Sequence, residues 1–164
     1  MKEHIMSRYS NVDKDTTKLI NSIINESFKH LLQARIKMIF DARKRKSSGK
    51  YVIGKIQKTN EFTRFLTSVE TGDPAGFDYF LYLDEKVFEA IDTIDKIRVV
   101  RHLLQYEDID YESDTPFKLR KEEVLTWYDE MEFNKEDPKW QDRLQAVAES
   151  IHNPEDNEVE NAQQ

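Results

Sequence analysis

The stretch from Ile94 to Glu112, IDKIRVVRHLLQYEDIDYE, decides the fold that the sequence predicts. Its apolar residues recur at the spacing of one helical face, and charged or polar residues occupy the other face. The apolar face consists of Ile97, Val99, Val100, Leu103 and Leu104. His102 and Tyr106 lie at the border of the two faces. The pattern predicts an amphipathic helix that begins after Thr93.

The spacing between His102 and Tyr106 equals that of the two histidines in an HExxH motif. In that motif both histidines reach one zinc ion, and the glutamate between them acts as general base. Here the five residues are His102, Leu103, Leu104, Gln105 and Tyr106. One histidine of two remains, and leucine stands at the position of the base. Taken alone, His102 is more typical of a hydrogen-bonded structural histidine at the edge of an apolar face.

The order and spacing of segments over roughly residues 31–128 resemble those of the phage metallopeptidase family, which are small zincin-like proteins of bacteriophages. The segments that carry the resemblance are RIKMIF at 35–40, GKYVIGKIQK at 49–58, YFLYLDEKVFEAI at 79–91, the helix at 92–106, the acidic turn at 108–112 and FKLRKEEV at 117–124. The resemblance implies that the first two segments form an opening hairpin. It also implies that the helix around His102 takes the place of the family's metal helix.

The metal motif itself departs from the family's pattern. His102 matches the first ligand, Leu103 replaces the glutamate, Tyr106 replaces the second histidine, and Glu122 stands where a later histidine is expected. Catalytic zinc usually has three protein ligands. The resemblance therefore implies a degenerate member of the family, in which these four positions are vestigial. We expect no catalytic residue, no bound metal and no cofactor.

The fold class that we predict is α+β. It comprises an N-terminal helix from Thr16, a small twisted sheet of three to four strands, the central zincin-like helix and a C-terminal helical pair. Residues 1–13 show no sustained period and are expected to be loosely docked. A short helix at 60–68 is expected to turn Phe62, Phe65 and Leu66 inward.

The length of 164 residues suits one domain with its own core. We expect a single zincin-like domain over residues 1–152 and an acidic disordered tail over 153–164. The absence of cysteine excludes a disulfide framework, a thiolate zinc site and a cysteine nucleophile. No apolar run is long enough for a membrane span, and the N-terminus has no apolar signal core. The expected location is the cytoplasm, that of the bacterial host if a phage encodes the chain.

Charge is distributed unevenly along the chain. Residues 1–58 carry 14 Lys and Arg against 5 Asp and Glu, whereas residues 59–164 carry 11 against 27, so the halves have net charges of +9 and −16. Two candidate binding surfaces follow, the basic loop of Arg43, Lys44, Arg45 and Lys46 and the acidic turn of Asp108, Asp110 and Glu112. No aromatic residue interleaves the four basic residues, and the acidic turn lacks the glycine and spacing of an EF-hand.

The leading functional hypothesis is a catalytically inactive metallopeptidase-like protein that binds a host macromolecule, in the manner of a host-takeover or anti-defence inhibitor. Its partner would be a host protein or protein complex, met by the acidic face of the C-terminal half. One alternative is a metal-dependent peptidase with a shifted zinc site made of His102, Glu122 and Glu107. Another is a nucleic-acid-binding module that uses the loop from Arg43 to Lys46. The sequence leaves the identity of the partner and the oligomeric state open.

Overall fold

The fold is built on a four-stranded sheet with the strand order β1-β2-β6-β5. The strands are β1 (Tyr9–Asn11), β2 (Ile36–Asp41), β5 (Gly54–Lys58) and β6 (Tyr79–Asp84). β2 and β6 are parallel, while β1 and β5 pair antiparallel at the two edges. The computed structural model describes residues 7–113, 116–120 and 127–162, of which residues 128 and 154–162 are described by their backbone alone. The predicted α+β class is confirmed.

Strand β6 lies at the centre of the sheet because it is the most apolar strand. Tyr79, Leu81 and Leu83 are fully buried on one of its faces, and Phe80 is buried on the other. The expected hairpin of segments 35–40 and 49–58 is therefore wrong, since β6 lies between β2 and β5. The chain between them forms instead a short ribbon of β3 (Lys46–Ser47) and β4 (Lys50–Tyr51). A strand that is buried on both faces takes a central place, where neighbours on both sides satisfy its backbone.

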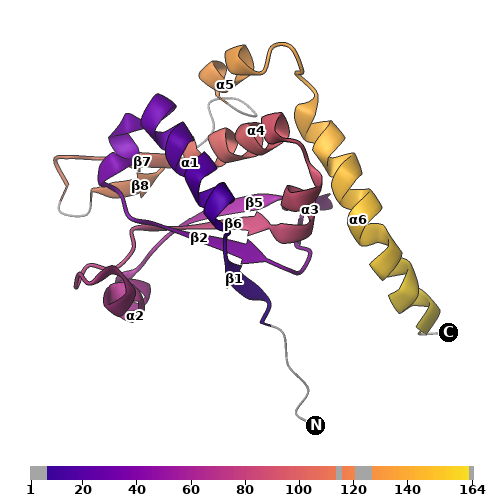
Figure 1. Cartoon of the computed structure of the whole chain (residues 1–164), viewed down its shortest axis with the longest axis horizontal. Coiled ribbons are helices and arrows are strands. Elements are labelled where there is room, and N and C mark those ends of the chain that lie inside the picture. The colour runs from indigo at the N-terminus through magenta and orange to yellow at the C-terminus, as the bar shows by residue number, and fades with distance from the viewer. Residues whose placement is uncertain (1–6, 114–115, 121–126, 163–164) are drawn as a thin grey trace, which may run out of the picture.

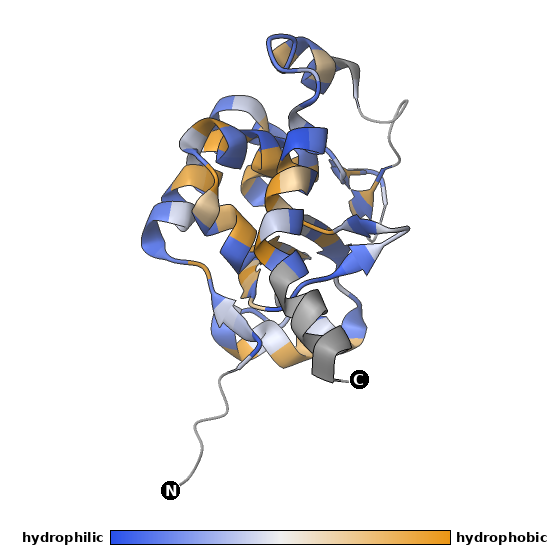
Figure 2. Cartoon of the chain, turned by 90° about the vertical axis from the view of Figure 1, so that its right-hand side faces the viewer, coloured by the Kyte–Doolittle hydropathy of each residue, from blue (hydrophilic) through white to orange (hydrophobic). Residues whose placement is uncertain are grey.

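Helices α1 (Lys14–Ser27) and α4 (Thr93–Leu104) lie side by side on one face of the sheet (Figure 1). Asp13 caps α1 and Asp92 caps α4, each by accepting a backbone N–H of the first turn. In Figure 2 the helices alternate between blue and orange along their length, as expected of elements with one face in the core. In the described part of the chain, no helix has both the length and the apolar character of a membrane span.

The remaining elements connect and cover this core. They are the 3-10 helix η1 (Lys29–Gln33), α2 (Glu61–Thr71), α3 (Glu85–Ala90), the ribbon of β7 (Glu107–Ile109) and β8 (Phe117–Leu119), α5 (Tyr128–Phe133) and α6 (Trp140–Ala162). Together α5 and α6 are the predicted C-terminal helical pair. The buried side chains of α4, α1 and β6 form one contiguous apolar cluster with Trp140, Leu144 and Ala148 of α6.

Helix α6 is fixed to the core by polar contacts. His152 Nε2 lies 2.7 Å from Asp84 Oδ2, and both side chains are buried. Nearer its start, Arg143 pairs with Asp95 of α4, and these hydrogen bonds hold the pKa of Asp95 below its usual range. The helix runs on to Ala162, past the boundary at residue 153 that was predicted for a disordered tail. The Glu and Ala residues there are good helix formers, and a proline removes one backbone donor without ending this helix.

Two further expectations about local structure are wrong. Tyr9–Asn11 is an edge strand and not a loosely docked segment, because it pairs with Ile39–Asp41 of β2. Helix α2 forms where it was predicted, but Phe62, Phe65 and Leu66 point outward and not into the core. None of the residues of α2 is buried.

Candidate functional site

His102 lies in the last turn of α4 and is held by a carboxylate. Its Nδ1 atom is 3.0 Å from both side-chain oxygens of Glu130 in α5, and Glu130 is buried. The Gln141 amide approaches the same nitrogen at 3.4 Å. A carboxylate that faces a ring nitrogen fixes the orientation of the imidazole and favours a proton on that nitrogen. His102 is thus a well-ordered side chain on the border of the apolar face, as the sequence predicted.

Three aromatic rings surround the imidazole of His102. Tyr106, Trp127 and Trp140 approach it with centroid distances of 5.6, 5.4 and 6.0 Å, all close to edge-to-face. Tyr106 and Trp127 also contact each other at 4.6 Å. Tyr106, which the resemblance aligns with the second histidine, therefore contributes a packed ring beside His102.

Leu103, which the resemblance aligns with the general base, is buried against the edge strand of the sheet. It faces Gly54, the first residue of β5, so closely that a Cβ atom on Gly54 would lie 2.4 Å from Leu103 Cδ1. The two residues are complementary in shape, with the leucine side chain filling the space that the glycine leaves. The leucine side chain therefore occupies the space directly over Gly54.

A cavity of about 260 Å³ lies beside His102, between α4, the start of β5 and α6. Its lining includes Ile53, Gly54, Leu103 and Trp140. Gln145 of α6 closes one side, because its amide both donates to the Tyr51 carbonyl at 2.7 Å and accepts from the Tyr51 N–H at 2.9 Å. These are the two backbone bonds that an added peptide strand would make with Tyr51.

The residues at this site do not fit a catalytic zinc ion. Within the described residues, no three His, Asp or Glu side chains are close enough together to share a metal. Leucine and tyrosine occupy positions 103 and 106, and Glu122 lies outside the residues that the structure describes. Leucine offers no donor atom, so His102 is the single nitrogen ligand that this helix contributes.

Glu107, the third ligand of the alternative zinc site, lies in a different place. It lines a cavity of about 330 Å³ with Leu104, Arg120 and His30, and that cavity shares no lining residue with the one beside His102. Glu107 is 1% exposed, and in the described part of the chain neither of its carboxylate oxygens has a hydrogen-bond partner. Burial, with a smaller contribution from Asp78, raises the pKa of Glu107 to about 8.

The acidic turn projects from the ribbon of β7 and β8. Asp108, Asp110 and Glu112 are all exposed. Asp110 shapes the turn by accepting the Glu112 N–H at 3.1 Å. The hydroxyl of Tyr79 anchors the ribbon to the central strand, because it lies 2.9 Å from the carbonyl oxygen of Asp108 and hydrogen-bonds the facing strand as well. The three carboxylates therefore lie on a ribbon that is anchored to the sheet, and they face solvent.

Side chains of the basic loop make contacts within the molecule that the sequence did not predict. Arg45 donates to the buried carboxylate of Asp41 at 2.7 Å and to the Tyr9 hydroxyl at 2.7 Å. Burial alone would raise the pKa of Asp41, but hydrogen bonds from Arg8 and Arg45 outweigh it and lower the pKa. Lys46 lies over the ring of Tyr51 at 4.7 Å. Arg45 and Lys46 thus have structural contacts within the molecule.

Sequence reasoning missed the residues that hold His102. Glu130 and Trp127 come from a segment 25 or more positions away, and nothing in their local pattern pointed to α4. Trp127, the residue just before α5, is 1% exposed. A buried glutamate can be found from sequence when it stands on an apolar face, but α5 has only six residues and no clear period.

Comparison with known proteins shows a family relationship that covers most of the chain. Residues 7–150 match the family described as "Putative phage metallopeptidase". No curated protein and no solved structure gives a significant match. The match spans the sheet, α4 and most of the segments around His102, well over half of the chain. The chain belongs to the phage metallopeptidase family.

Proposed function

We propose that this protein is a non-catalytic member of its family and that it acts by binding a host macromolecule. The observation that carries the first part is Leu103, which stands at the position of the general base and packs against Gly54. Peptide hydrolysis by a zincin requires a metal to polarise the carbonyl group and a base to activate water. A buried leucine side chain can accept no proton.

The surroundings of His102 support the same proposal. Its Nδ1 faces Glu130, and three aromatic rings enclose the imidazole. Contacts of this kind stabilise the packing between α4, α5 and α6 without any metal. A fold without catalytic activity still presents surfaces to which a partner can bind.

The acidic ribbon of β7 and β8 is the surface that we assign to the partner. Asp108, Asp110 and Glu112 are exposed and concentrated on one turn, and Tyr79 holds the ribbon in place. Such a surface attracts a basic partner and speeds its association. The partner class that fits this charge is a host protein whose basic surface normally contacts nucleic acid. Binding of that kind would suit a host-takeover or anti-defence role.

The two alternative functions have less support. A shifted zinc site would need His102 and Glu107 together, and they line separate cavities. A nucleic-acid-binding loop would need free basic side chains, whereas Arg45 pairs with Asp41 and Lys46 lies over Tyr51.

The binding proposal can be tested by removing charge without removing hydrogen-bond acceptors. The triple variant Asp108→Asn, Asp110→Asn and Glu112→Gln should lose host proteins that the natural chain captures from a lysate of the host, as identified by mass spectrometry. Binding of the purified partner should then weaken at least tenfold, and its salt dependence should become shallower.

A matched control carries the same change of net charge elsewhere. Glu89→Gln, Glu136→Gln and Glu149→Gln alter three exposed residues outside the acidic ribbon, and this variant should bind as the natural chain does. Equal binding by all three proteins would contradict the assignment of the surface. Loss of binding on changing Arg43→Gln and Lys44→Gln instead would favour the nucleic-acid alternative.

A further inference from the structure

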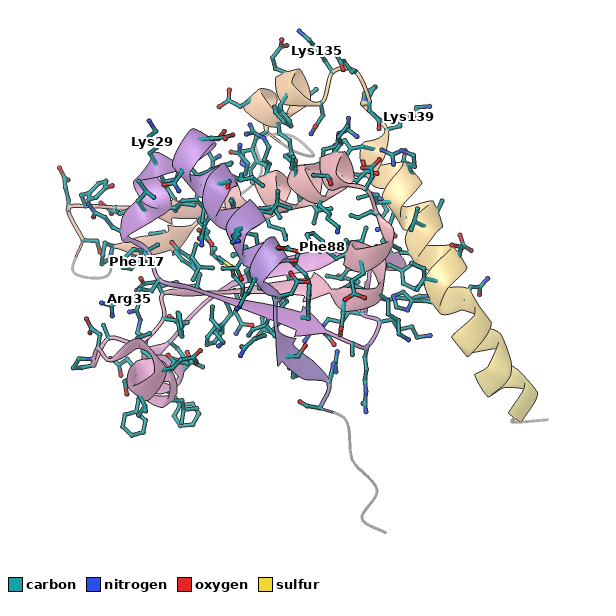
Figure 3. All side chains as sticks on the ribbon, in the orientation of Figure 1. Lys29, Arg35, Phe88, Phe117, Lys135 and Lys139 are labelled. Carbon is teal, nitrogen blue, oxygen red and sulfur yellow. The ribbon has the colours of Figure 1, made fainter. Side chains whose placement is uncertain are left out.

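Helix α2 presents a continuous apolar face to solvent. Phe62, Phe65, Leu66 and Val69 recur at the spacing of one helical stripe, and they are 67%, 71%, 57% and 91% exposed. Figure 3 shows aromatic side chains of α2 extending away from the rest of the molecule. Single exposed apolar residues are ordinary, but a contiguous stripe on one helix marks a contact surface.

Polar contacts on the inner side fix α2 in this orientation. Arg64 pairs with the buried carboxylate of Asp78 at 2.9 Å, and the hydroxyl of Thr67 accepts the Phe77 N–H at 3.1 Å. Gly76, with a positive φ of 63°, lets the following loop pass so near that a Cβ atom there would lie 2.2 Å from the Arg64 carbonyl oxygen. The helix is thus held with Arg64 and Thr67 toward the loop at 73–78 and its apolar face outward.

The ends of α2 are equally well defined. Asn60 and Thr63 form a capping box at the start, and Gly72 closes the end in the left-handed conformation. The apolar face is therefore already formed in the single chain, which lowers the entropic cost of association.

Three ion pairs within the molecule lie around the face. Lys37 pairs with Glu70, Arg35 with Asp73 at 2.8 Å, and Arg64 with Asp78. The rim is thus close to neutral, although the whole chain has a net charge of −7. A neutral rim attracts neither a basic partner nor an anionic membrane, and it removes the repulsion that two acidic chains would otherwise feel.

We infer that α2 is a self-association surface, on which a second copy of this chain packs with its own α2 antiparallel. The stripe is nearly symmetric about its centre, so that Phe62 would meet Val69 of the second copy and Phe65 would meet Leu66. A face that matches itself under a two-fold rotation is what an isologous dimer requires. This inference does not depend on the proposed function, because it concerns a different surface.

The size of the face agrees with a weak dimer. The four side chains expose on the order of 500 Å² of apolar surface. Two copies would together bury about 1,000 Å², which is near the lower limit for a specific interface. We therefore expect association in the micromolar range rather than a permanent dimer.

Sedimentation of the full chain from low micromolar to near-millimolar concentration tests the inference. The mass should rise from that of one chain, 19.5 kDa, toward twice that value. Phe65→Glu should abolish the rise, whereas the matched control Ile94→Glu, at a residue of α4 that is 60% exposed, should not. A single-chain mass at every concentration, or a dimer that survives Phe65→Glu, would overturn the inference. Monomers that bind neutral phosphatidylcholine vesicles through this face would overturn it in favour of a membrane surface.

Introduced cysteines provide a second readout that does not depend on a disruptive charge. The natural chain has no cysteine, so any disulfide arises from the new residue. In an antiparallel pair Leu66→Cys lies near the two-fold axis and should form a disulfide-linked dimer on oxidation, while Glu61→Cys at the end of the helix should not. Cross-linking of Glu61→Cys without that of Leu66→Cys would contradict the antiparallel arrangement.

Discussion

Helix α4 buries Val100 and Leu104 completely, whereas helix α2, with the same apolar spacing, leaves Phe65 and Val69 largely in solvent. The periodicity of a sequence defines an apolar face, but it does not say where that face points. In α4 the face meets the sheet and α1. In α2 the polar face carries the buried contacts of Arg64 and Thr67, and the apolar face is left for a partner.

The difference also separates two kinds of constraint on the chain. Residues of α4 are fixed by packing, so that Leu103 and Gly54 must fit each other. Residues on the outer face of α2 are free of such constraints within one molecule. Substitutions should therefore act on folding in α4 and on association in α2.

The largest expected effect follows from placing a carboxylate in each helix. Leu103→Glu should lower the free energy of unfolding by about 3–5 kcal/mol, because the charge would be buried beside Gly54 without a partner. Phe65→Glu should change it by less than about 0.5 kcal/mol. Urea denaturation at a protein concentration below that of association measures both. Similar losses of unfolding free energy in the two variants would contradict this difference between α4 and α2.

The second effect concerns an ionisable side chain that the chain buries just after α4. The pKa of Glu107 is raised to about 8 in the folded protein, against about 4.3 in an unfolded chain. Between these pH values the folded state keeps a proton that the unfolded state releases, so this group's contribution to stability is complete below pH ~4 and is lost as pH rises toward 8.

Glu107→Gln should remove that dependence on pH. We expect the variant to gain on the order of a few kcal/mol over the natural chain at pH 8 and little at pH 4.5. Thermal or urea unfolding at several pH values measures the difference, and Asp108→Asn, at an exposed neighbour, serves as the control. Parallel stability curves for the natural chain and the Gln variant would show that Glu107 is ionised in the fold.

A smaller effect tests the fit between α4 and the edge strand. Gly54→Ala should destabilise the protein by about 1–2 kcal/mol, because the new methyl group would meet the end of the Leu103 side chain. In a Leu103→Ala background the same change should be neutral or stabilising, since the space is then empty. A double-mutant cycle by urea denaturation gives the coupling energy. Additive effects would mean that the two residues do not share this space.

Much of the fold could be predicted from sequence because its elements carry local signals. The apolar face of α4 and the apolar segment that forms β6 were both recognisable in short windows of sequence. The order of the strands could not be predicted in this way. The choice between a hairpin and the insertion of β6 depends on which strand is buried on both faces. The orientation of α2 likewise depends on distant partners such as Asp78.

Some features of the candidate site could likewise be predicted from sequence, and others could not. The helical position of His102 and the burial of Leu103 followed from the spacing of residues in α4. The contact with Glu130 and the enclosure by Trp127 and Trp140 bring together segments that are far apart in sequence. Contacts between distant segments cannot be predicted from the pattern of any one segment.

The zinc content of the purified full-length protein tests the central claim most directly. With no base at Leu103 and no second histidine at Tyr106, we predict far less than one equivalent of zinc after preparation without chelator, and a melting temperature that EDTA leaves unchanged. A zinc ion bound by the fold would couple to stability. One equivalent of zinc per chain, with a lower melting temperature in EDTA, would contradict the account.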